Sequence, residues 1–310
     1  MDPVLLHLGT PARGERWQTL LPRLVPGLTV RLWPDMGDPA AITHVAAWTP
    51  PDDLFAMLPN LAMVFSVGAG VDQLRADALP DHVALVRTVE PGLVVEMADY
   101  ATLAVLALHR DLPHYLMAQR AGQWAPQPVI AKGARRVTVL GLGAMGGAIA
   151  TQIAALGFPV TGWSRRPRDL PGIDCRHGAD ALTDVLAISD ILICALPLTP
   201  ATRHILNAAT FARLPRGAAI VNMGRGGHLD QVALLAALDT GQVAAAMLDV
   251  TDPEPLPPDH PLWRHPRVLL TPHVAAETDI DGGARAVAAA ILAHRAGTLP
   301  PGLVDRSAGY

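Results

Sequence analysis

The sequence predicts an α/β protein with two domains, each built on a parallel sheet. Short apolar runs bounded by glycine and proline alternate with helical segments in both halves of the chain, a pattern typical of β-α-β units. A length of 310 residues suits roughly two domains. Half of the residues are apolar and 17% are charged, so the chain can bury a sizeable core and is not of the disordered class.

The first half carries the strands of one predicted sheet. The expected strands are Val4–Leu8, Leu28–Leu32, His44–Trp48, Ala62–Val67 and His82–Val86. Segments such as Ala12–Leu24 and Asp52–Leu58 separate them and are expected to form crossover helices. Strands of this length joined in this way favour a parallel sheet.

A long apolar helix is predicted from Val94 to Gln119. Its apolar residues cover most of the helix circumference, so we expect it to be buried on several sides. A helix that crosses between two domains, or that lies in a dimer interface, has this composition. Gly122–Pro128 is then predicted to be an irregular connection.

A second alternation begins at Arg136 and predicts a second, doubly wound sheet. The expected strands are Val137–Leu140, Pro159–Trp163, Ile191–Ala195, Ala218–Asn222, Ala244–Asp249 and Val268–Thr271. The expected helices are Ala144–Leu156, Ala181–Ser189 and, near the end of the chain, Gly282–Ala296.

Charge and cysteine content argue against several kinds of partner. A net charge of −4 gives no electrostatic footprint for nucleic acid or an anionic membrane. Two cysteines are too few for a disulfide framework or a thiolate metal site, and the 12 histidines show no ligand spacing. Met1–Thr10 lacks the pattern of a signal peptide, and no apolar run approaches the ~20 residues that span a bilayer. We therefore expect a cytoplasmic protein without a metal.

A dinucleotide site is predicted at Gly141-Leu142-Gly143-Ala144-Met145-Gly146, which matches G-x-G-x-x-G between a strand and a helix. Gly141 permits the tight turn, and Gly143 permits the close approach of a pyrophosphate. Gly146 lets the helix pack on the strand, so that its N-terminus faces the phosphates. A glycine-rich turn without a ligand is the alternative.

The end of the next strand indicates which dinucleotide binds. NAD sites usually carry Asp or Glu there to hold the ribose 2′-OH, whereas this strand runs into Ser164-Arg165-Arg166. A hydroxyl and two guanidinium groups would bind a 2′-phosphate through charge-assisted hydrogen bonds. We therefore predict NADP(H) in preference to NAD(H), the alternative being a solvated basic loop.

Three charged side chains, Arg225, Glu254 and His273, each follow a different predicted strand. Ligands of open α/β sheets bind at the carboxyl ends of strands, so these side chains can converge beside a nicotinamide. A guanidinium binds the carboxylate of a 2-oxo acid, and an imidazolium donates the proton that balances hydride transfer. A neighbouring carboxylate orients the imidazole and favours its protonated form. Each residue taken alone has a structural alternative: a helix cap, a loop carboxylate or a structural histidine.

With these motifs in order, the chain resembles the D-isomer-specific 2-hydroxyacid dehydrogenase family over nearly its whole length. The segments that carry the resemblance are Ser66–Asp72, Gly141–Gly146, Leu196–Thr199, Asn222–Gly227, Asp249–Pro255 and Thr271–Thr278. Within the family it looks most like the glyoxylate/hydroxypyruvate reductase A branch, through Ala47–Pro51, Gly162–Arg165, His273–Ala276 and Val304–Arg306.

The resemblance implies that a Rossmann cofactor domain, residues 99–281, is inserted into a smaller flavodoxin-like substrate domain made of residues 1–98 and 282–310. It also implies a homodimer built around the helix near Met97–Arg120. Arg225 would bind and polarise the substrate, His273 would be the general acid/base, and Glu254 would be the partner of His273.

Further roles follow from the resemblance alone. Ala69 and Gly70 would offer N–H groups to the substrate carboxylate, and Trp48 would border the substrate. Asp249 would hold the carboxamide of the nicotinamide. The other residues expected at the cofactor are Ala144, Met145, Leu196, Pro197, Thr202, Met223 and Gly224.

Two segments depart from the family pattern without removing a catalytic group. His273-Val274-Ala275 stands where much of the family has His-Ile-Gly, and Met97-Ala98-Asp99-Tyr100 stands where many members have Val-Ala-Glu-His. The expected activity is NADPH-dependent reduction of small 2-oxo acids, glyoxylate to glycolate and hydroxypyruvate to D-glycerate. The same chemistry on a larger 2-oxo acid, or a non-catalytic dinucleotide-sensing module, are the alternatives.

Overall fold

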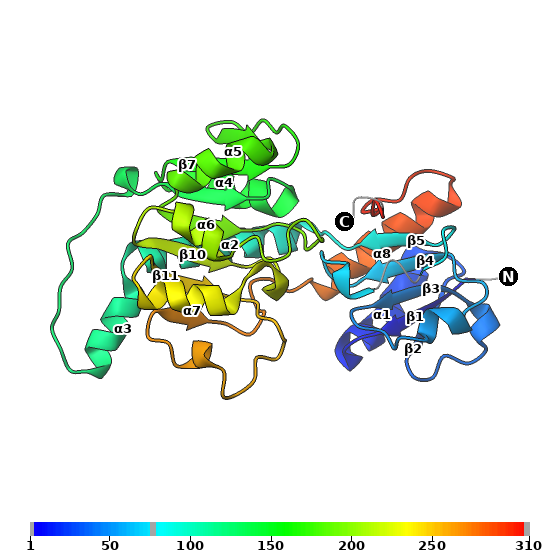
Figure 1. The fold of residues 1–310 in the computed structure, drawn as a ribbon. Coiled ribbons are helices and arrows are strands. Elements are labelled where there is room, and N and C mark those ends of the chain that lie inside the picture. Colours follow the sequence, from blue (N-terminus) through cyan, green and yellow to red (C-terminus); the bar gives the residue numbers. More distant parts are fainter. Residues whose placement is uncertain (1–2, 75–78, 307–310) are drawn as a thin grey trace. The chain divides into compact units, whose positions relative to one another are not determined.

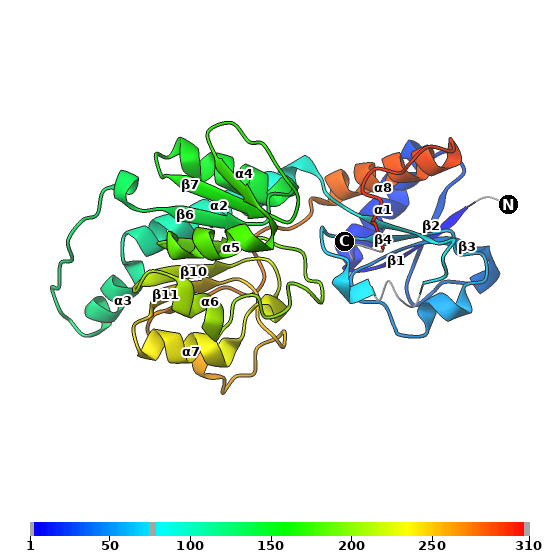
Figure 2. The ribbon, with the colours of Figure 1, turned by 45° about the horizontal axis from the view of Figure 1, so that its top comes forward.

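The computed structural model describes residues 3–74 and 79–306, and the chain divides into two compact units (Figures 1 and 2). The first unit combines Met1–Leu93 with Glu277–Tyr310, and the second is Val94–Ala276. The second unit is therefore an insertion in the chain of the first. The domain boundaries expected from the sequence lie a few residues further along the chain at both crossings. Residues 1–2, 75–78 and 307–310 of the expected substrate domain lie outside the described residues.

The first unit contains a five-stranded parallel sheet with the order β2-β1-β3-β4-β5. This is the flavodoxin-like order. Its strands are β1 (Val4–Leu8), β2 (Thr29–Leu32), β3 (Ile42–Ala47), β4 (Met63–Ser66) and β5 (Ala84–Arg87). Helices α1 (Pro11–Leu24) and α8 (Ile280–Arg295) pack on one face of the sheet, where Trp17 and Ile291 share a buried cluster with Phe65.

Over the described residues of this unit, the segments that cover the other face of the sheet are short helical turns. A crossover helix is expected from the sequence over Asp52–Leu58, but the structure has a 3₁₀ turn, η2 (Leu54–Met57). Leu54 and Phe55 are nevertheless buried against Val45 and Val64. A segment this short can cover the sheet with two side chains without completing an α-helix.

The second unit contains a seven-stranded parallel sheet with the order β12-β11-β10-β9-β6-β7-β8. The order confirms the predicted Rossmann class. Its strands are β6 (Val137–Leu140), β7 (Val160–Ser164), β8 (Asp174–His177), β9 (Ile191–Cys194), β10 (Ala218–Asn222), β11 (Val243–Leu248) and β12 (Val268–Leu270).

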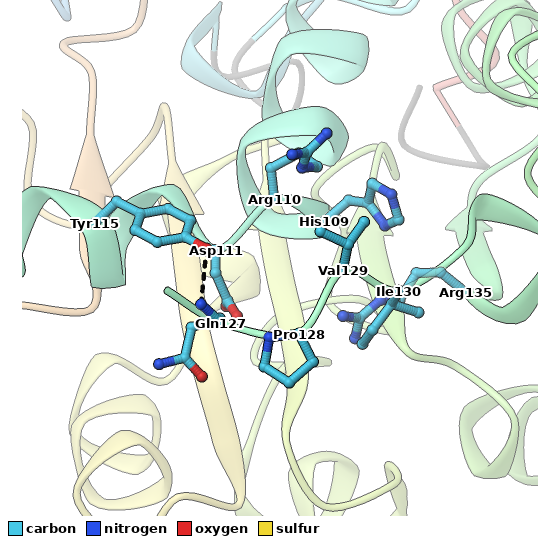
Figure 3. Close-up of a pocket in the computed structure, with 9 residues that line it drawn as sticks. All are labelled: His109, Arg110, Asp111, Tyr115, Gln127, Pro128, Val129, Ile130 and Arg135. Atoms are coloured by element: carbon cyan, nitrogen blue, oxygen red, sulfur yellow. Dashed lines mark hydrogen bonds between the residues drawn. The ribbon is translucent and has the colours of Figure 1, made fainter. Parts of the chain in front are cut away.

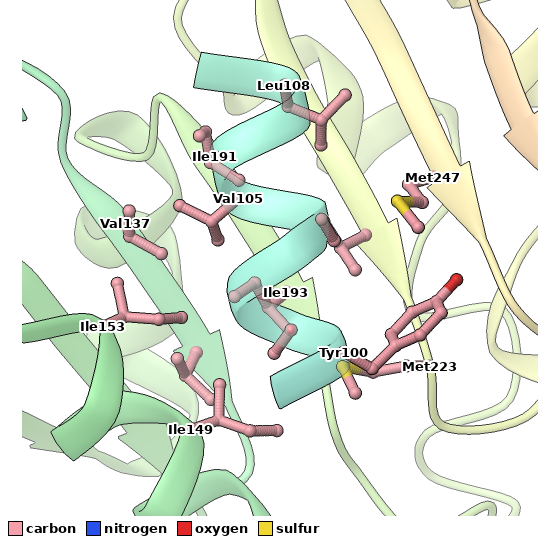
Figure 4. Close-up of a cluster of buried hydrophobic side chains, with 14 of the residues drawn as sticks. Tyr100, Val105, Leu108, Val137, Ile149, Ile153, Ile191, Ile193, Met223 and Met247 are labelled. Atoms are coloured by element: carbon pink, nitrogen blue, oxygen red, sulfur yellow. The ribbon is translucent and has the colours of Figure 1, made fainter. Parts of the chain in front are cut away.

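Helices cover both faces of this sheet. The helices of the second unit are α2 (Pro91–His109), α3 (Leu112–Arg120), α4 (Ala144–Ala155), α5 (Gly178–Ala187), α6 (Ala208–Arg213) and α7 (Gln231–Asp239). Buried side chains of α2 and α4 form one cluster with the strands, part of which Figure 4 shows, and those of α5, α6 and α7 form the other. β8, α6 and α7 are not predicted from the sequence.

The single helix expected over Val94–Gln119 is two helices, because α2 ends at His109 and α3 begins at Leu112. Pro113 lacks an N–H group, and its ring would clash with the carbonyl group four residues earlier, which is that of His109. Asp111 makes the break in a left-handed conformation with φ of 55°. Leu103 on α2 is 57% exposed, so one side of the helix is not covered within the chain.

The helix α2 is long and apolar enough to cross a membrane by length and composition. In the structure its buried residues, among them Ala101, Val105 and Leu108, belong to the core of the second unit (Figure 4). Packing on the seven-stranded sheet therefore accounts for the buried side of α2, while Val95 and Leu103 remain exposed.

Two buried histidines make the stability of the first unit depend on pH. His7 on β1 and His44 on β3 are 2% and 5% exposed, and burial lowers the pKa of each from 6.5 to about 4. The unfolded chain therefore takes up protons at these positions at a higher pH than the folded chain does. Their contribution to stability is complete above pH 6.5 and is lost as the pH falls towards 4.

We predict that the free energy of unfolding of the first unit falls by about 1–2 kcal/mol per histidine between pH 7 and pH 5. Urea titrations at the two pH values measure this loss. His44→Gln should reduce this loss of unfolding free energy by the contribution of one histidine. His82→Gln, at an exposed position, is the matched control and should leave the loss unchanged. An unchanged loss in His44→Gln would contradict the prediction.

Candidate active site

The expected catalytic and cofactor residues all lie in the second unit, where strands of the parallel sheet end. In chain order the loops follow β6 (Gly141–Gly146), β7 (Ser164–Arg166), β9 (Leu196–Thr202), β10 (Met223–Arg225), β11 (Asp249–Glu254) and β12 (Thr271–Ala275). Because all the strands are parallel, their carboxyl ends meet at one edge of the sheet. The topology of the sheet therefore places all six loops at the same edge.

The glycine loop after β6 has the shape that a pyrophosphate requires. Gly141 has φ of 100°, and a Cβ atom there would lie 2.7 Å from the carbonyl oxygen of Ala195. A Cβ atom on Gly146 would lie 1.7 Å from the carbonyl oxygen of Gly141, so α4 can pack this closely only with glycine. Apart from Gly143 and its neighbours in the chain, no atom lies within 4 Å of a Cβ position on Gly143. This space at the N-terminus of α4 fits a bound phosphate group.

The loop after β7 is tied to the glycine loop. The N–H of Gly141 donates to the carbonyl oxygen of Trp163 at 2.8 Å. Ser164 is buried, and its hydroxyl donates to the carbonyl oxygen of Arg166 at 2.7 Å. The hydrogen bond from Ser164 therefore stabilises the turn after β7. Arg165 and Arg166 lie in this turn and are exposed.

The loop after β9 closes on itself through Thr202. The Thr202 hydroxyl donates to the carbonyl oxygen of Pro197 at 2.7 Å and accepts the N–H of Thr199 at 2.8 Å. The carbonyl oxygen of Leu196 lies 3.1 Å from the Cβ position of Gly224, so this loop borders the loop after β10. Met223 is 3% exposed and belongs to the core (Figure 4), which leaves only its backbone for a cofactor.

The backbone of Arg225 is held on both sides. The Nδ2 of Asn222 donates to the carbonyl oxygen of Arg225 at 3.0 Å, and the N–H of Arg225 donates to Nδ1 of His228 at 3.0 Å. Asn222 and His228 are fully buried. A Cβ atom on Gly226 would lie 1.8 Å from the carbonyl oxygen of Thr251, so glycine allows this loop to lie against the loop after β11.

Neither Asn222 nor His228 is predicted from the sequence as a site residue. The sequence feature that could have indicated them is their distance from Arg225: Asn222 precedes it by three residues and His228 follows it by three. His228 is the third residue of the 3₁₀ turn Gly226–His228, whose N-cap is Arg225, and this is the spacing of a capping pair.

The side chains of His273 and Glu254 form a direct hydrogen bond. Nδ1 of His273 lies 2.8 Å from Oε2 of Glu254, and Oε1 of Glu254 accepts the N–H of Thr251 at 3.0 Å. Burial raises the pKa of the Glu254 carboxyl group, but the hydrogen bonds from His273 and Thr251 and the charge of Arg225 outweigh burial and lower it. Glu254 is therefore a carboxylate at neutral pH, and Nδ1 of His273 is the donor.

Asp249 has a different environment from that of Glu254. It is 2% exposed, and Oδ1 accepts the Thr271 hydroxyl at 2.7 Å and the N–H of Val274 at 2.8 Å. Oδ2 accepts the N–H of Ala275 at 2.9 Å. A carboxylate has about four acceptor positions, so these contacts leave room for one further donor such as a carboxamide.

The expected substrate residues Trp48, Ala69 and Gly70 lie in the first unit, after β3 and β4. The Ser66 hydroxyl donates to the carbonyl oxygen of Gly70 and shapes the loop. Trp48 packs beside Gly68, where a Cβ atom would lie 2.8 Å from the indole ring. The indole is 36% exposed, so part of it faces solvent.

A pocket elsewhere in the second unit lies where α2 gives way to α3 (Figure 3). Residues 109–111, Tyr115, residues 127–130 and Arg135 line it, and none of them is an expected site residue. The N–H of Gln127 donates to the Tyr115 hydroxyl at 3.1 Å across this region (Figure 3). Over residues 3–74 and 79–306 we find no group of three or more His, Cys, Asp or Glu that could hold a metal ion.

Comparison with known proteins places this geometry in context. Residues 102–275 match the family model described as D-isomer specific 2-hydroxyacid dehydrogenase, NAD binding domain. Glyoxylate/hydroxypyruvate reductase A of Serratia proteamaculans is 40% identical over 302 residues, which cover 96% of each chain.

Two solved structures are similar to this chain over its full length. A D-isomer specific 2-hydroxyacid dehydrogenase from Xanthobacter autotrophicus, in complex with NADPH and MES, superposes with a TM-score of 0.94 at 40% identity and covers 100% of both chains. An NADPH-dependent glyoxylate/hydroxypyruvate reductase from Sinorhizobium meliloti, in complex with NADP and sulfate, gives a TM-score of 0.92 at 34% identity, again over 100% of both chains.

Proposed function

The chain belongs to the D-isomer-specific 2-hydroxyacid dehydrogenase family of oxidoreductases, and on that premise we propose that it uses NADPH to reduce glyoxylate to glycolate and hydroxypyruvate to D-glycerate. The observation that carries the proposal is the 2.8 Å contact between His273 and Glu254, in the unit that also holds Arg225 and the glycine loop. In this proposal the second unit is the cofactor domain and the first is the substrate domain.

Each side chain has one chemical task in the proposed reaction. A bound nicotinamide supplies the hydride, which is added to the carbonyl carbon of the 2-oxo acid. His273 holds a proton at Nε2 and donates it to the carbonyl oxygen, which becomes the hydroxyl group of the product. Glu254 accepts from Nδ1, which fixes the ring and compensates its charge. Arg225 binds the substrate carboxylate and draws electron density from the carbonyl group.

The preference for NADPH rests on the loop after β7. No acidic side chain stands at the end of this strand to hold a ribose 2′-OH, and Arg165 and Arg166 are exposed there. The similar proteins from Xanthobacter and Sinorhizobium were crystallised with NADPH and NADP respectively. Two guanidinium groups near a 2′-phosphate favour NADPH over NADH.

We predict that the purified protein oxidises NADPH faster than NADH when either is supplied at low concentration with hydroxypyruvate, as absorbance at 340 nm measures. The double variant Arg165→Ala/Arg166→Ala should raise KM for NADPH about tenfold or more and change KM for NADH little. Arg168→Ala, also exposed in this loop, is the matched control.

Three outcomes of this assay count against parts of the proposal. Faster turnover with NADH would overturn the cofactor preference and leave the reaction intact. Turnover of phenylpyruvate but not of glyoxylate or hydroxypyruvate would overturn the substrate class. No turnover of any 2-oxo acid would overturn the activity.

Two substitutions test the roles of the proposed catalytic residues. His273→Ala should lower kcat by roughly 10²–10⁴, which is the contribution of a general acid, whereas His177→Ala at an exposed position should leave kcat unchanged. Arg225→Lys keeps the charge but loses the forked geometry, so it should raise KM for the 2-oxo acid. Steady-state kinetics with hydroxypyruvate measure both, and wild-type values would remove the residue from the mechanism.

We also propose that two copies of the chain form a homodimer through α2, α3 and the connection that follows. Figure 1 shows α3 and this connection extending from the seven-stranded sheet. Large apolar side chains are exposed along them: Leu103, Leu112, Tyr115, Trp124 and Val129. Trp124 is 98% exposed, an unusual position for an indole unless another surface covers it.

Light scattering should give the mass of a dimer for the wild-type protein. Trp124→Ala should shift the population towards the monomer, since a buried interface Trp commonly contributes about 2 kcal/mol or more to binding. Trp263→Ala removes a half-exposed indole of the same unit and should leave the mass unchanged. A monomeric wild-type protein would refute the dimer.

A further inference from the structure

Tyr100 joins α2 to the loop that carries His273. Its hydroxyl lies 2.6 Å from the Thr271 hydroxyl, and Thr271 donates to Oδ1 of Asp249 at 2.7 Å. Figure 4 shows the Tyr100 ring beside Met223, with its hydroxyl pointing away from the helix. Tyr100 is 8% exposed and Asp249 is 2% exposed, so both ends of this chain of hydrogen bonds are buried, while Thr271 between them is half-buried.

The order of the protons along this chain follows from the chemistry of its members. The Asp249 carboxylate only accepts, so Thr271 uses its one hydroxyl proton on Asp249. The contact between Tyr100 and Thr271 then requires the proton of Tyr100. Burial raises the pKa of Tyr100 to about 12, so the phenol keeps this proton. Tyr100 donates to Thr271, and Thr271 donates to Asp249.

Asp249 shapes the turn that presents His273. His273 has φ of 56°, a left-handed conformation that is unfavourable for a residue other than glycine. The N–H of His273 donates to the carbonyl oxygen of Asp249 at 2.7 Å, and the side chain of Asp249 accepts the N–H groups of Val274 and Ala275. Three successive N–H groups are therefore bonded to one residue, and these bonds offset the conformational strain.

We propose that Tyr100 is a positioning residue of the reaction: through Thr271 it orients the Asp249 carboxylate, which holds the His273–Ala275 turn in register with Glu254. The inference rests on the proposed role of His273. It gives a role to Tyr100 in the segment Met97-Ala98-Asp99-Tyr100.

The proposed positioning role depends on the hydroxyl group of Tyr100 rather than on its ring. The ring packs with Met223 and Met247 in the core of the second unit, and Tyr100→Phe keeps that packing. Phenylalanine leaves Thr271 without its donor and Asp249 less firmly oriented. Because the 2-oxo acid is bound by Arg225 on another loop, the loss should appear in kcat and not in KM for the 2-oxo acid.

Kinetics of a set of variants with hydroxypyruvate test the inference. Tyr100→Phe should lower kcat about five- to tenfold without changing KM for hydroxypyruvate. Thr271→Val should lower kcat at least as much, and Thr271→Ser, which keeps the hydroxyl, should retain most of the activity. The double variant Tyr100→Phe/Thr271→Val should be no slower than Thr271→Val alone, because both act through one chain of hydrogen bonds.

Tyr115→Phe is the matched control, because Tyr115 contacts Gln127 and not the His273 turn. It should leave kcat unchanged. A Tyr100→Phe protein with wild-type kcat, whether or not its melting temperature falls, would overturn the inference. Independent, additive losses in the double variant would overturn it as well.

A measurement without turnover separates this inference from the proposed function. In protein labelled with ¹⁵N-histidine, the Nδ1–H resonance of His273 is assigned by its absence in His273→Gln. Tyr100→Phe should shift this resonance, and Tyr115→Phe should not. An unshifted resonance overturns the positioning role even if the enzyme is active. A shifted resonance in a protein that reduces no 2-oxo acid supports positioning and refutes the proposed reaction.

Discussion

The parallel alignment of the seven-stranded sheet is the constraint from which the candidate site follows. Each strand enters the sheet from the same side, so each connection after a strand begins at the same edge. Residues as far apart in sequence as Gly141 and His273 are gathered there by the pairing of the strands that precede them. Local contacts then set the shape of each loop, as Thr202 does after β9 and Asn222 does after β10.

Burial separates the tasks of two carboxylates that both contact the His273 loop. Asp249 is buried, and its carboxylate oxygens accept hydrogen bonds from two backbone N–H groups and a hydroxyl. Its charge therefore stabilises the backbone conformation of the turn after β12. Glu254 is partly exposed and meets the imidazole itself. The same functional group thus holds a backbone turn in one position and a side-chain imidazole in the other.

Much of this arrangement can be predicted from the sequence because it depends on local patterns. Buried strands such as β6 and β9 are continuous apolar runs, and the glycine loop is dictated by contacts that exclude a Cβ atom. The edge strand β8 could not be predicted, since it is short and mostly exposed. The break at Asp111 was missed although Pro113, which cannot continue a helix, marks it in the sequence. The bond from Tyr100 to Thr271 joins residues that only the folded chain brings near, so no spacing rule indicates it.

The division of the first unit into two pieces of chain has a consequence for synthesis on the ribosome. The α1 face that carries Arg16 and Trp17 is covered by α8, to which it is tied by bonds to Asp281 and Ile280. While residues 94–276 are being translated, that face has no partner. At typical elongation rates the delay is roughly ten to forty seconds. The inserted unit is continuous and can complete its fold first, whereas the N-terminal sheet gains the contacts of α8 only after the inserted unit has been synthesised.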